Sequence, residues 1–216
     1  MPCRQVTPDV RCLTSLSMIA ATINSASRAV PTWVLYPVLV IPGVWLFMTE
    51  LTNPGPDPIA ALEHGLGEYA LQLLILGLAI TPLRDLAGVN LIRYRRAIGL
   101  MAFFYVCAHL LTYLVLDNQF WWDALIKDLT KRPYIIVGVL AFLILIPLAW
   151  TSNNLQVRRW GPLAWRRLHY LVYPAVILGA LHFLLLKKTW QAEPMIYTAL
   201  ALALVAYRVP RLLRRP

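Results

Sequence analysis

The four histidines of this sequence are its best candidates for chemistry: His64, His109, His169 and His182. His109 and His182 lie inside long apolar runs, and His169 lies at the start of the run that contains His182. A polar ring buried in lipid is costly and usually has a function. Since imidazole is a common axial ligand of haem iron, the sequence predicts that buried histidines bind haem, with the histidine nitrogens as metal ligands.

The composition places these histidines in a membrane protein. Of the 216 residues, 59% are hydrophobic and only 14% are charged, whereas soluble domains have about a quarter charged residues. The net charge of +10 does not indicate nucleic acid binding, because the basic residues stand in short clusters between apolar runs. That placement is typical of the loops of a membrane protein, so membrane lipid is the expected surrounding and nucleic acid is not expected as a partner.

Six apolar segments are each close to the length of a membrane-spanning helix, about 17 to 25 residues. The segments are Trp33–Met48, Leu62–Leu83, Ala97–Leu116, Tyr134–Trp150, Leu168–Leu186 and Pro194–Val209. The connections between them are too short for a soluble domain. The sequence therefore predicts an all-α membrane protein, a six-transmembrane-helix bundle forming one domain over residues 32–212.

The first 31 residues are mixed in character, and their apolar patch at Leu13–Ile23 is shorter than a membrane span. We expect residues 1–31 to form a poorly ordered N-terminal extension, with a signal peptide as the alternative.

The basic residues predict that both termini are cytoplasmic. With a cytoplasmic N-terminus, fifteen of the twenty Lys and Arg residues fall on the inner side: Arg4, Arg11, Arg28, Arg84, Arg93, Arg95, Arg96, Arg158, Arg159, Arg166, Arg167, Arg208, Arg211, Arg214 and Arg215. Five fall on the outer side: Lys127, Lys131, Arg132, Lys187 and Lys188. Cytoplasmic loops carry such an excess.

Depth in the membrane separates the histidines. At 1.5 Å per residue, His109 lies roughly 20 Å from the inner edge and His182 roughly 22 Å from it, on different helices. A haem can be bound between two helices when each helix supplies one imidazole at the same depth. His169 lies only about 3 Å inside the inner edge, and His64 lies near the outer edge, where a ligand role is the less favoured interpretation.

His169 and His182 are 13 residues apart, which leaves them roughly 140° out of phase on an ideal helix. Pro174 lies between them, so a kink there could change their relation.

Four arginines near the predicted inner edge are secondary candidates: Arg95, Arg96, Arg166 and Arg167. Topology alone explains arginines in these positions. A guanidinium also suits a haem propionate or a flavin phosphate, so contacts with such an anion are the alternative. The sequence contains no P-loop, G-x-G-x-x-G, H-E-x-x-H or Ser-His-Asp set, and whether the chain itself is an enzyme stays open.

Several blocks of sequence carry a resemblance to a known family. They are Arg95–Leu100 ahead of His109–Tyr113, Thr130–Tyr134, and Leu168–Tyr173 followed by His182. In this order and spacing, residues 32–212 resemble the haem-binding membrane subunit of the bacterial protein-methionine-sulfoxide reductase system (the MsrQ/YedZ family), part of the ferric-reductase-like transmembrane group.

The resemblance implies a non-catalytic electron-transfer subunit of the bacterial inner membrane. It implies a b-type haem on His109, His182 and His169, and an associated FMN. Electrons are expected from the quinone pool or a cytosolic flavin reductase, and are expected to reach a periplasmic molybdopterin catalytic subunit that repairs oxidised methionines. The oxidase relatives have an inner histidine on the third helix where this chain has Arg95 or Arg96, so a second haem is left open.

Two other functions remain open from the sequence. One is a free-standing ferric reductase or quinol-linked cytochrome b. The other, of a different class, is a transporter or scaffold whose histidines are structural.

Overall fold

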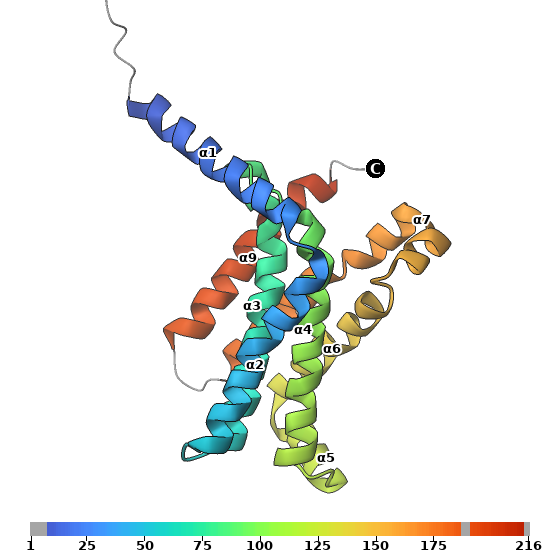
Figure 1. Ribbon diagram of the computed structural model, residues 1–216. Helices are drawn as coiled ribbons and strands as arrows, with labels where there is room; N and C mark the ends of the chain where they lie inside the picture. The colour runs from blue at the N-terminus through green and yellow to red at the C-terminus, as the bar shows by residue number, and fades with distance from the viewer. Residues whose placement is uncertain (1–7, 187–190, 214–216) are drawn as a thin grey trace, which may run out of the picture.

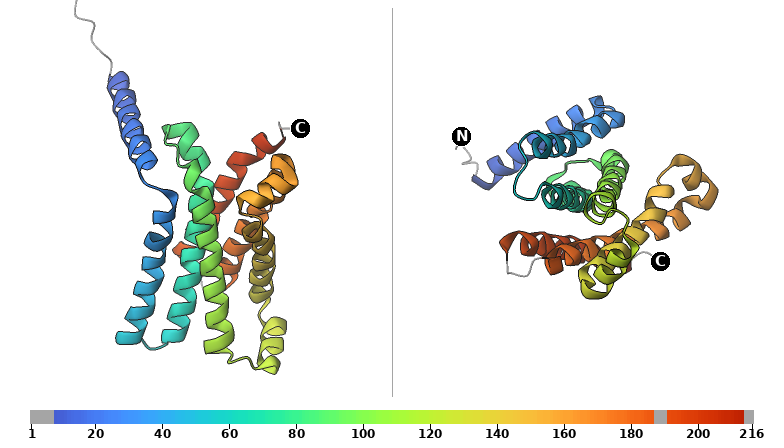
Figure 2. Two further views of the ribbon diagram at one scale, coloured as in Figure 1. Left: turned by 45° about the vertical axis from the view of Figure 1, so that its right-hand side comes forward. Right: turned by 90° about the horizontal axis from the view of Figure 1, so that it is seen from below.

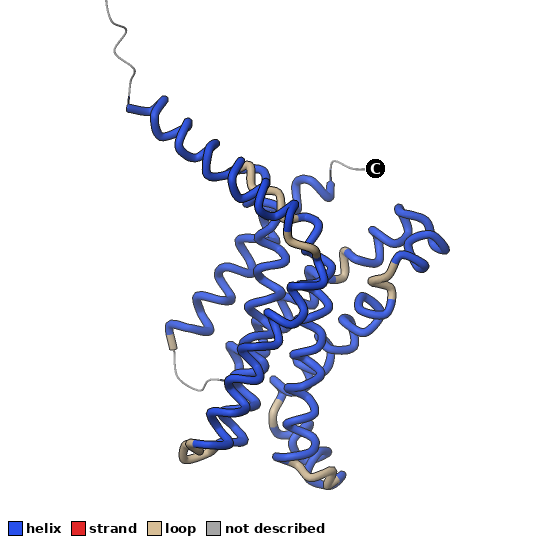
Figure 3. Tube along the Cα trace, in the orientation of Figure 1, coloured by secondary structure: helices blue, strands red, loops and turns tan. Residues whose placement is uncertain are grey.

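The computed structural model describes residues 8–186 and 191–213, and in this part of the chain it consists of helices joined by short loops (Figure 3). Side chains are described for residues 18–186 and 191–210. The α-helices of the described residues are α1 (Pro8–Ala29), α2 (Leu35–Thr52), α3 (Pro58–Ala87), α4 (Arg95–Leu111), α5 (Trp122–Lys131), α6 (Pro133–Trp150), α7 (Asn154–His169), α8 (Val172–Leu186) and α9 (Ala192–Leu213).

Six helical stretches are long and apolar enough to cross a membrane, which confirms the predicted all-α bundle of six membrane helices. They comprise residues Thr32–Thr52, Pro58–Ala87, Ile92–Asp117, Pro133–Trp150, Asn154–Leu186 and Ala192–Pro210. The chain is therefore a multi-pass membrane protein.

Helix α3 lies at the centre of the bundle and contacts α2, α4, α8 and α9 (Figure 2). Its buried residues extend from Leu62 to Ile80, so neighbouring helices cover most of its length. Helix α2 differs, because none of its residues is buried and large side chains such as Ile41, Trp45 and Leu51 are exposed. Lipid is the natural cover for an apolar helix surface of this kind.

The fifth predicted segment, Leu168–Leu186, is not one continuous helix, and this prediction needs correction. Helix α7 ends at His169 and α8 begins at Val172. At the break, the amides of Leu171 and Tyr173 donate to carbonyls three residues earlier. Pro174 then falls in the first turn of α8, where its missing N–H costs no helical hydrogen bond. His169 and His182 therefore lie on different helices, and the phase between them on one helix does not apply.

Two helices occupy connections in which no helix was expected. Helix α5 follows a loop in which Gln119 and Phe120 have positive φ values of 47° and 58°. Helix α7 points away from the bundle (Figure 1) and is interrupted at Gly161, with φ 80° and ψ 155°, just before Pro162.

Helix α1 occupies most of the segment expected to be a poorly ordered extension. Asn24 joins its C-terminal part to the loop after α3, since its amide donates to the Gly88 carbonyl at 2.9 Å and its side-chain oxygen accepts from the Asn90 amide at 2.7 Å. The Tyr94 hydroxyl donates to the Ser27 carbonyl at 2.6 Å. The division into residues 1–31 and 32–212 stays a prediction.

Helix α1 and the C-terminal end of α9 lie at the same end of the molecule (Figure 1). We call this the arginine-rich end, because Arg84, Arg95, Arg96 and Arg208 also lie toward it. Which side of the membrane it faces stays a prediction. Some residues of the charge count, namely Arg4, Lys187, Lys188, Arg214 and Arg215, lie outside the described residues.

Candidate functional site

The structure brings His109 and His182 together from different helices. His109 lies on α4 and His182 on α8, and the centroids of their rings are 6.1 Å apart with the planes inclined by 79°. Both side chains line one cavity inside the bundle. Cofactor sites in helical bundles are formed in this way, by side chains of facing helices.

Each of the two imidazoles is oriented by a backbone carbonyl. His109 Nδ1 lies 2.9 Å from the carbonyl oxygen of Glu63 on α3, and His182 Nδ1 lies 2.7 Å from that of Tyr134 on α6. A carbonyl can only accept, so Nδ1 carries the proton and donates in both cases. The lone pair of each ring is then on Nε2, the nitrogen left for a metal ion. Histidine ligands are commonly oriented by such a hydrogen bond on the other nitrogen.

A glycine one helical turn after each carbonyl lets the imidazole approach. Gly67 follows Glu63 by four residues, and a Cβ atom on Gly67 would lie 3.1 Å from His109 Nδ1. Gly138 follows Tyr134 by four residues, and a Cβ atom there would lie 2.8 Å from His182 Nδ1. Both rings therefore rest against backbone that has no side chain, and the same arrangement occurs twice.

The cavity between the histidines is mainly apolar. The side chains leave a cavity of about 90 Å³ between them, partly open to the outside. The apolar lining includes Leu71, Leu74, Val106, Phe142, Leu145 and Phe183. His64 and Glu68 also line it, although the His64 side chain is exposed. Small-molecule pockets are commonly lined in this way, by mostly apolar side chains with few polar groups.

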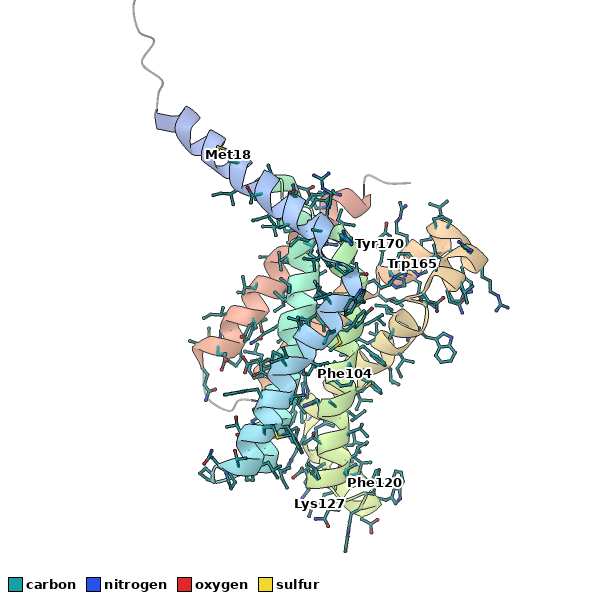
Figure 4. The ribbon with its side chains drawn as sticks, viewed as in Figure 1. Met18, Phe104, Phe120, Lys127, Trp165 and Tyr170 are labelled. Atoms are coloured by element: carbon teal, nitrogen blue, oxygen red, sulfur yellow. The ribbon has the colours of Figure 1, made fainter. Side chains whose placement is uncertain are left out.

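His169 lies elsewhere, at the end of α7, and it is not among the residues that line the cavity. Its ring stacks on Trp165 with 3.8 Å between centroids, at the base of α7, where Figure 4 labels Trp165 and Tyr170. Its Nδ1 lies 3.0 Å from the Trp165 carbonyl, and its Nε2 lies 3.4 Å from Ser152 Oγ. Its Nδ1 therefore donates to a carbonyl as in the other two histidines, but its ring faces no second imidazole in the part of the chain that is described.

The four candidate arginines are also away from the cavity, at the arginine-rich end. Arg95 donates to Thr81 Oγ1 at 2.6 Å and Arg96 to Asn154 Oδ1 at 2.7 Å. Arg166 and Arg167 are exposed on α7. Their roles toward a propionate or a flavin stay predictions.

The residues around the cavity fit a haem. Two imidazole–metal bonds of about 2 Å each, with half of each ring added, span about 6 Å, which matches the observed separation of the ring centroids. Both Nε2 atoms carry a lone pair, and the lining is apolar. The described residues contain no group of three or more His, Cys, Asp or Glu side chains suited to a bare metal ion. Two imidazoles in an apolar cavity are the ligand set of a metal that a macrocycle already holds.

The orienting groups were not identified from the sequence. Backbone carbonyls have no sequence signature, but the glycines do, since a glycine in a membrane helix facing a histidine indicates close approach of the ring to backbone. Also unforeseen is the π-helix at Thr112–Asp117, which directly follows α4. Such π-helical turns are frequent at functional sites.

Comparison with known proteins identifies the family. The family profile described as the ferric-reductase-like transmembrane component matches residues 66–180, which include His109 and His169. Curated relatives named protein-methionine-sulfoxide reductase heme-binding subunit MsrQ, from Brucella ovis, Brucella canis and Brucella suis, are each 47% identical over 180 residues, covering 83% of this chain and 81% of theirs. The chain therefore belongs to the ferric-reductase-like transmembrane family and, within it, to the MsrQ family.

Proposed function

We propose that this protein is the haem-binding membrane subunit of a methionine-sulfoxide reductase system and conducts electrons across the bacterial inner membrane. The observation that carries the proposal is the pair of histidines in one cavity, with their ring centroids 6.1 Å apart. In each ring Nδ1 is hydrogen-bonded to a backbone carbonyl, which leaves Nε2 for iron. The names of the Brucella relatives, which state haem binding and a reductase system, support it.

His109 and His182 would hold one b-type haem through their Nε2 atoms. The carbonyls of Glu63 and Tyr134 fix the tautomer and direction of each ring. Hydrogen bonds of this kind also raise the basicity of the ligand nitrogen. The bound haem supplies a carrier that takes up and releases one electron at a time. The mainly apolar side chains around it would lower the local polarity, so the protein would set the conditions for electron transfer without taking part in bond chemistry itself.

The proposed overall reaction transfers two electrons from a donor to methionine sulfoxide. A periplasmic molybdopterin catalytic subunit would convert one methionine sulfoxide, two electrons and two protons into methionine and water. The electrons would come from a quinol, which becomes a quinone and releases two protons, or from a reduced flavin of a cytosolic reductase. An FMN associated with this subunit would be the intermediate carrier on the donor side.

We place the donor side at the arginine-rich end, where His169 lies. Its ring is half-buried between Trp165 and Ser152, and the exposed Arg166 and Arg167 precede it on the same helix. His169 would thus act near the point at which electrons are received, as a ligand of a second, weakly held haem or beside the flavin. His64 also lines the cavity, but its side chain is exposed, so it would remain the less favoured candidate for a ligand.

Reconstitution tests this proposal. The purified protein is placed in vesicles with a quinol inside and a periplasmic methionine-sulfoxide reductase subunit outside. We expect a Soret band that shifts on reduction and turnover of methionine sulfoxide that requires the membrane protein. A colourless protein would refute haem binding and favour a structural role for the histidines. A reducible haem with electron transfer only to ferric chelates would indicate a ferric reductase instead.

A further inference from the structure

Two arginines at the arginine-rich end, the half-buried Arg95 and the buried Arg208, share one hydroxyl group. Arg95, the first residue of α4, donates from Nη2 to Thr81 Oγ1 at 2.6 Å, and Arg208 of α9 donates from Nη2 to the same oxygen at 2.7 Å. The two guanidinium groups are therefore separated by a single oxygen atom. Arg208 is only 9% exposed, so its charge is removed from water.

The remaining contacts of Arg208 are explained by the fold. Pro82 has no N–H group to donate to the carbonyl of Leu78, four residues earlier in α3. Arg208 Nη2 donates to that carbonyl at 2.7 Å. Its Nη1 donates to the Tyr173 hydroxyl at 3.2 Å, and the guanidinium carbon lies 5.7 Å from the centre of the Tyr173 ring. These partners are neutral, so they orient the guanidinium without balancing its charge.

Neither arginine has a carboxylate partner within the described residues. The ion pairs found there are Arg84–Asp85 and Arg132–Asp128. The Nε atoms of Arg95 and Arg208 are both buried and have no hydrogen-bond acceptor. A buried charge without a partner is strongly destabilising, and an unmade hydrogen bond of a buried donor adds to that cost. The cluster therefore lacks a negative charge and at least two acceptor atoms.

We propose that Arg95, Arg208 and Thr81 form a binding site for a phosphate group, which we call the Arg95–Arg208 site. A phosphate supplies acceptor oxygens in several directions, and guanidinium groups bind phosphate through paired, charge-assisted hydrogen bonds. The phosphate belongs either to the headgroup of an anionic phospholipid or to a soluble phosphate compound. This site is separate from the histidine cavity, which neither arginine lines, so the proposal does not require haem binding there.

Binding of two probes tests the proposal on the full-length protein. Inorganic phosphate is titrated by calorimetry into protein in phosphatidylcholine nanodiscs, and retained phosphatidylglycerol is counted by native mass spectrometry after mixed nanodiscs are dissociated. We expect the wild type to hold one phosphate-bearing anion. Arg95→Gln and Arg208→Gln should each weaken binding about tenfold or more, as the loss of a charge-assisted hydrogen bond requires.

Arg84→Gln is the matched control, because it removes one charge at the same end from an exposed arginine already paired with Asp85. It should bind like the wild type. Arg95→Gln keeps the bond from Arg208 to Leu78, so it reports on the site even if Arg208→Gln does not fold. Retention of phosphatidylglycerol alone identifies a lipid headgroup, and binding of inorganic phosphate identifies a soluble compound. Binding of neither probe, or equal weakening by Arg84→Gln and Arg95→Gln, would overturn the proposal.

Discussion

Replacing Gly138 by alanine should separate haem binding from folding. The added Cβ atom would lie 2.8 Å from Nδ1 and 2.9 Å from Cε1 of His182, closer than carbon atoms approach in proteins. The His182 ring must therefore move away from α6. Since the ring is held by the 2.7 Å hydrogen bond to the Tyr134 carbonyl, this movement lengthens or breaks the bond that orients Nε2.

The magnitude follows from the group that is lost. A hydrogen bond of this kind contributes about 0.5 to 1.5 kcal/mol, and loss of an outer partner of a ligand histidine costs about 10- to 100-fold in metal affinity. Alanine instead of glycine inside a helix stabilises the fold by roughly 0.5 to 1 kcal/mol. We therefore expect Gly138→Ala to lower haem affinity 10- to 100-fold while the haem-free protein melts no lower than the wild type.

Titration of haem into the haem-free variants, followed at the Soret band, measures this effect. Alanine substitutions at two other glycines provide a graded comparison of the loss in haem affinity. Gly67→Ala brings a Cβ atom to 3.1 Å from His109 Nδ1, whereas a Cβ atom on Gly99 would meet nothing within 4 Å. The expected order of affinity loss is Gly138, then Gly67, with none at Gly99. Wild-type haem affinity in Gly138→Ala, or an equal loss in Gly99→Ala, would refute the proposed positioning of His182.

Three further predictions concern other parts of the chain. His169→Ala should leave the spectrum of the main haem and its reduction by dithionite largely intact while electron transfer from the natural donor slows sharply; complete loss of haem, or unchanged turnover, would refute the proposed donor-side role. Reporter fusions after Pro216 should be active only in the cytoplasm and those within 117–132 only in the periplasm, and the reverse result would invert the topology. Asn24→Ala removes the bonds to Gly88 and Asn90, so limited proteolysis should release α1 faster with no change in haem content.

The six membrane helices could be predicted because lipid imposes a simple rule on length and hydropathy. The proximity of His109 and His182 followed from the same rule, since a fixed rise per residue converts sequence position into depth. The break between α7 and α8 could not be predicted in this way. The residues between His169 and Pro174 are apolar or aromatic and include no glycine, so nothing in the sequence marks a stop at His169 rather than at Pro174.

The orienting carbonyls and the burial of Arg208 could not be predicted from the sequence for a different reason. In sequence, Arg208 is one of many arginines that satisfy the charge rule for cytoplasmic ends. Its burial depends on Pro82 of another helix, which leaves the Leu78 carbonyl without its usual donor. Likewise, the role of Glu63 comes from its backbone and not from its carboxylate. Pairings between helices of this kind require the fold.

The absorption spectra of His109→Ala, His182→Ala and the double variant test the central claim most directly. Each single variant should lose most of the haem, because on the proposed function each would remove one of two ligands of the same iron. The double variant should be little worse than either single one, since the two ligands act as a unit. If both single variants kept the full Soret absorbance and the spectrum of a bis-histidine haem, His109 and His182 would not be the pair of ligands.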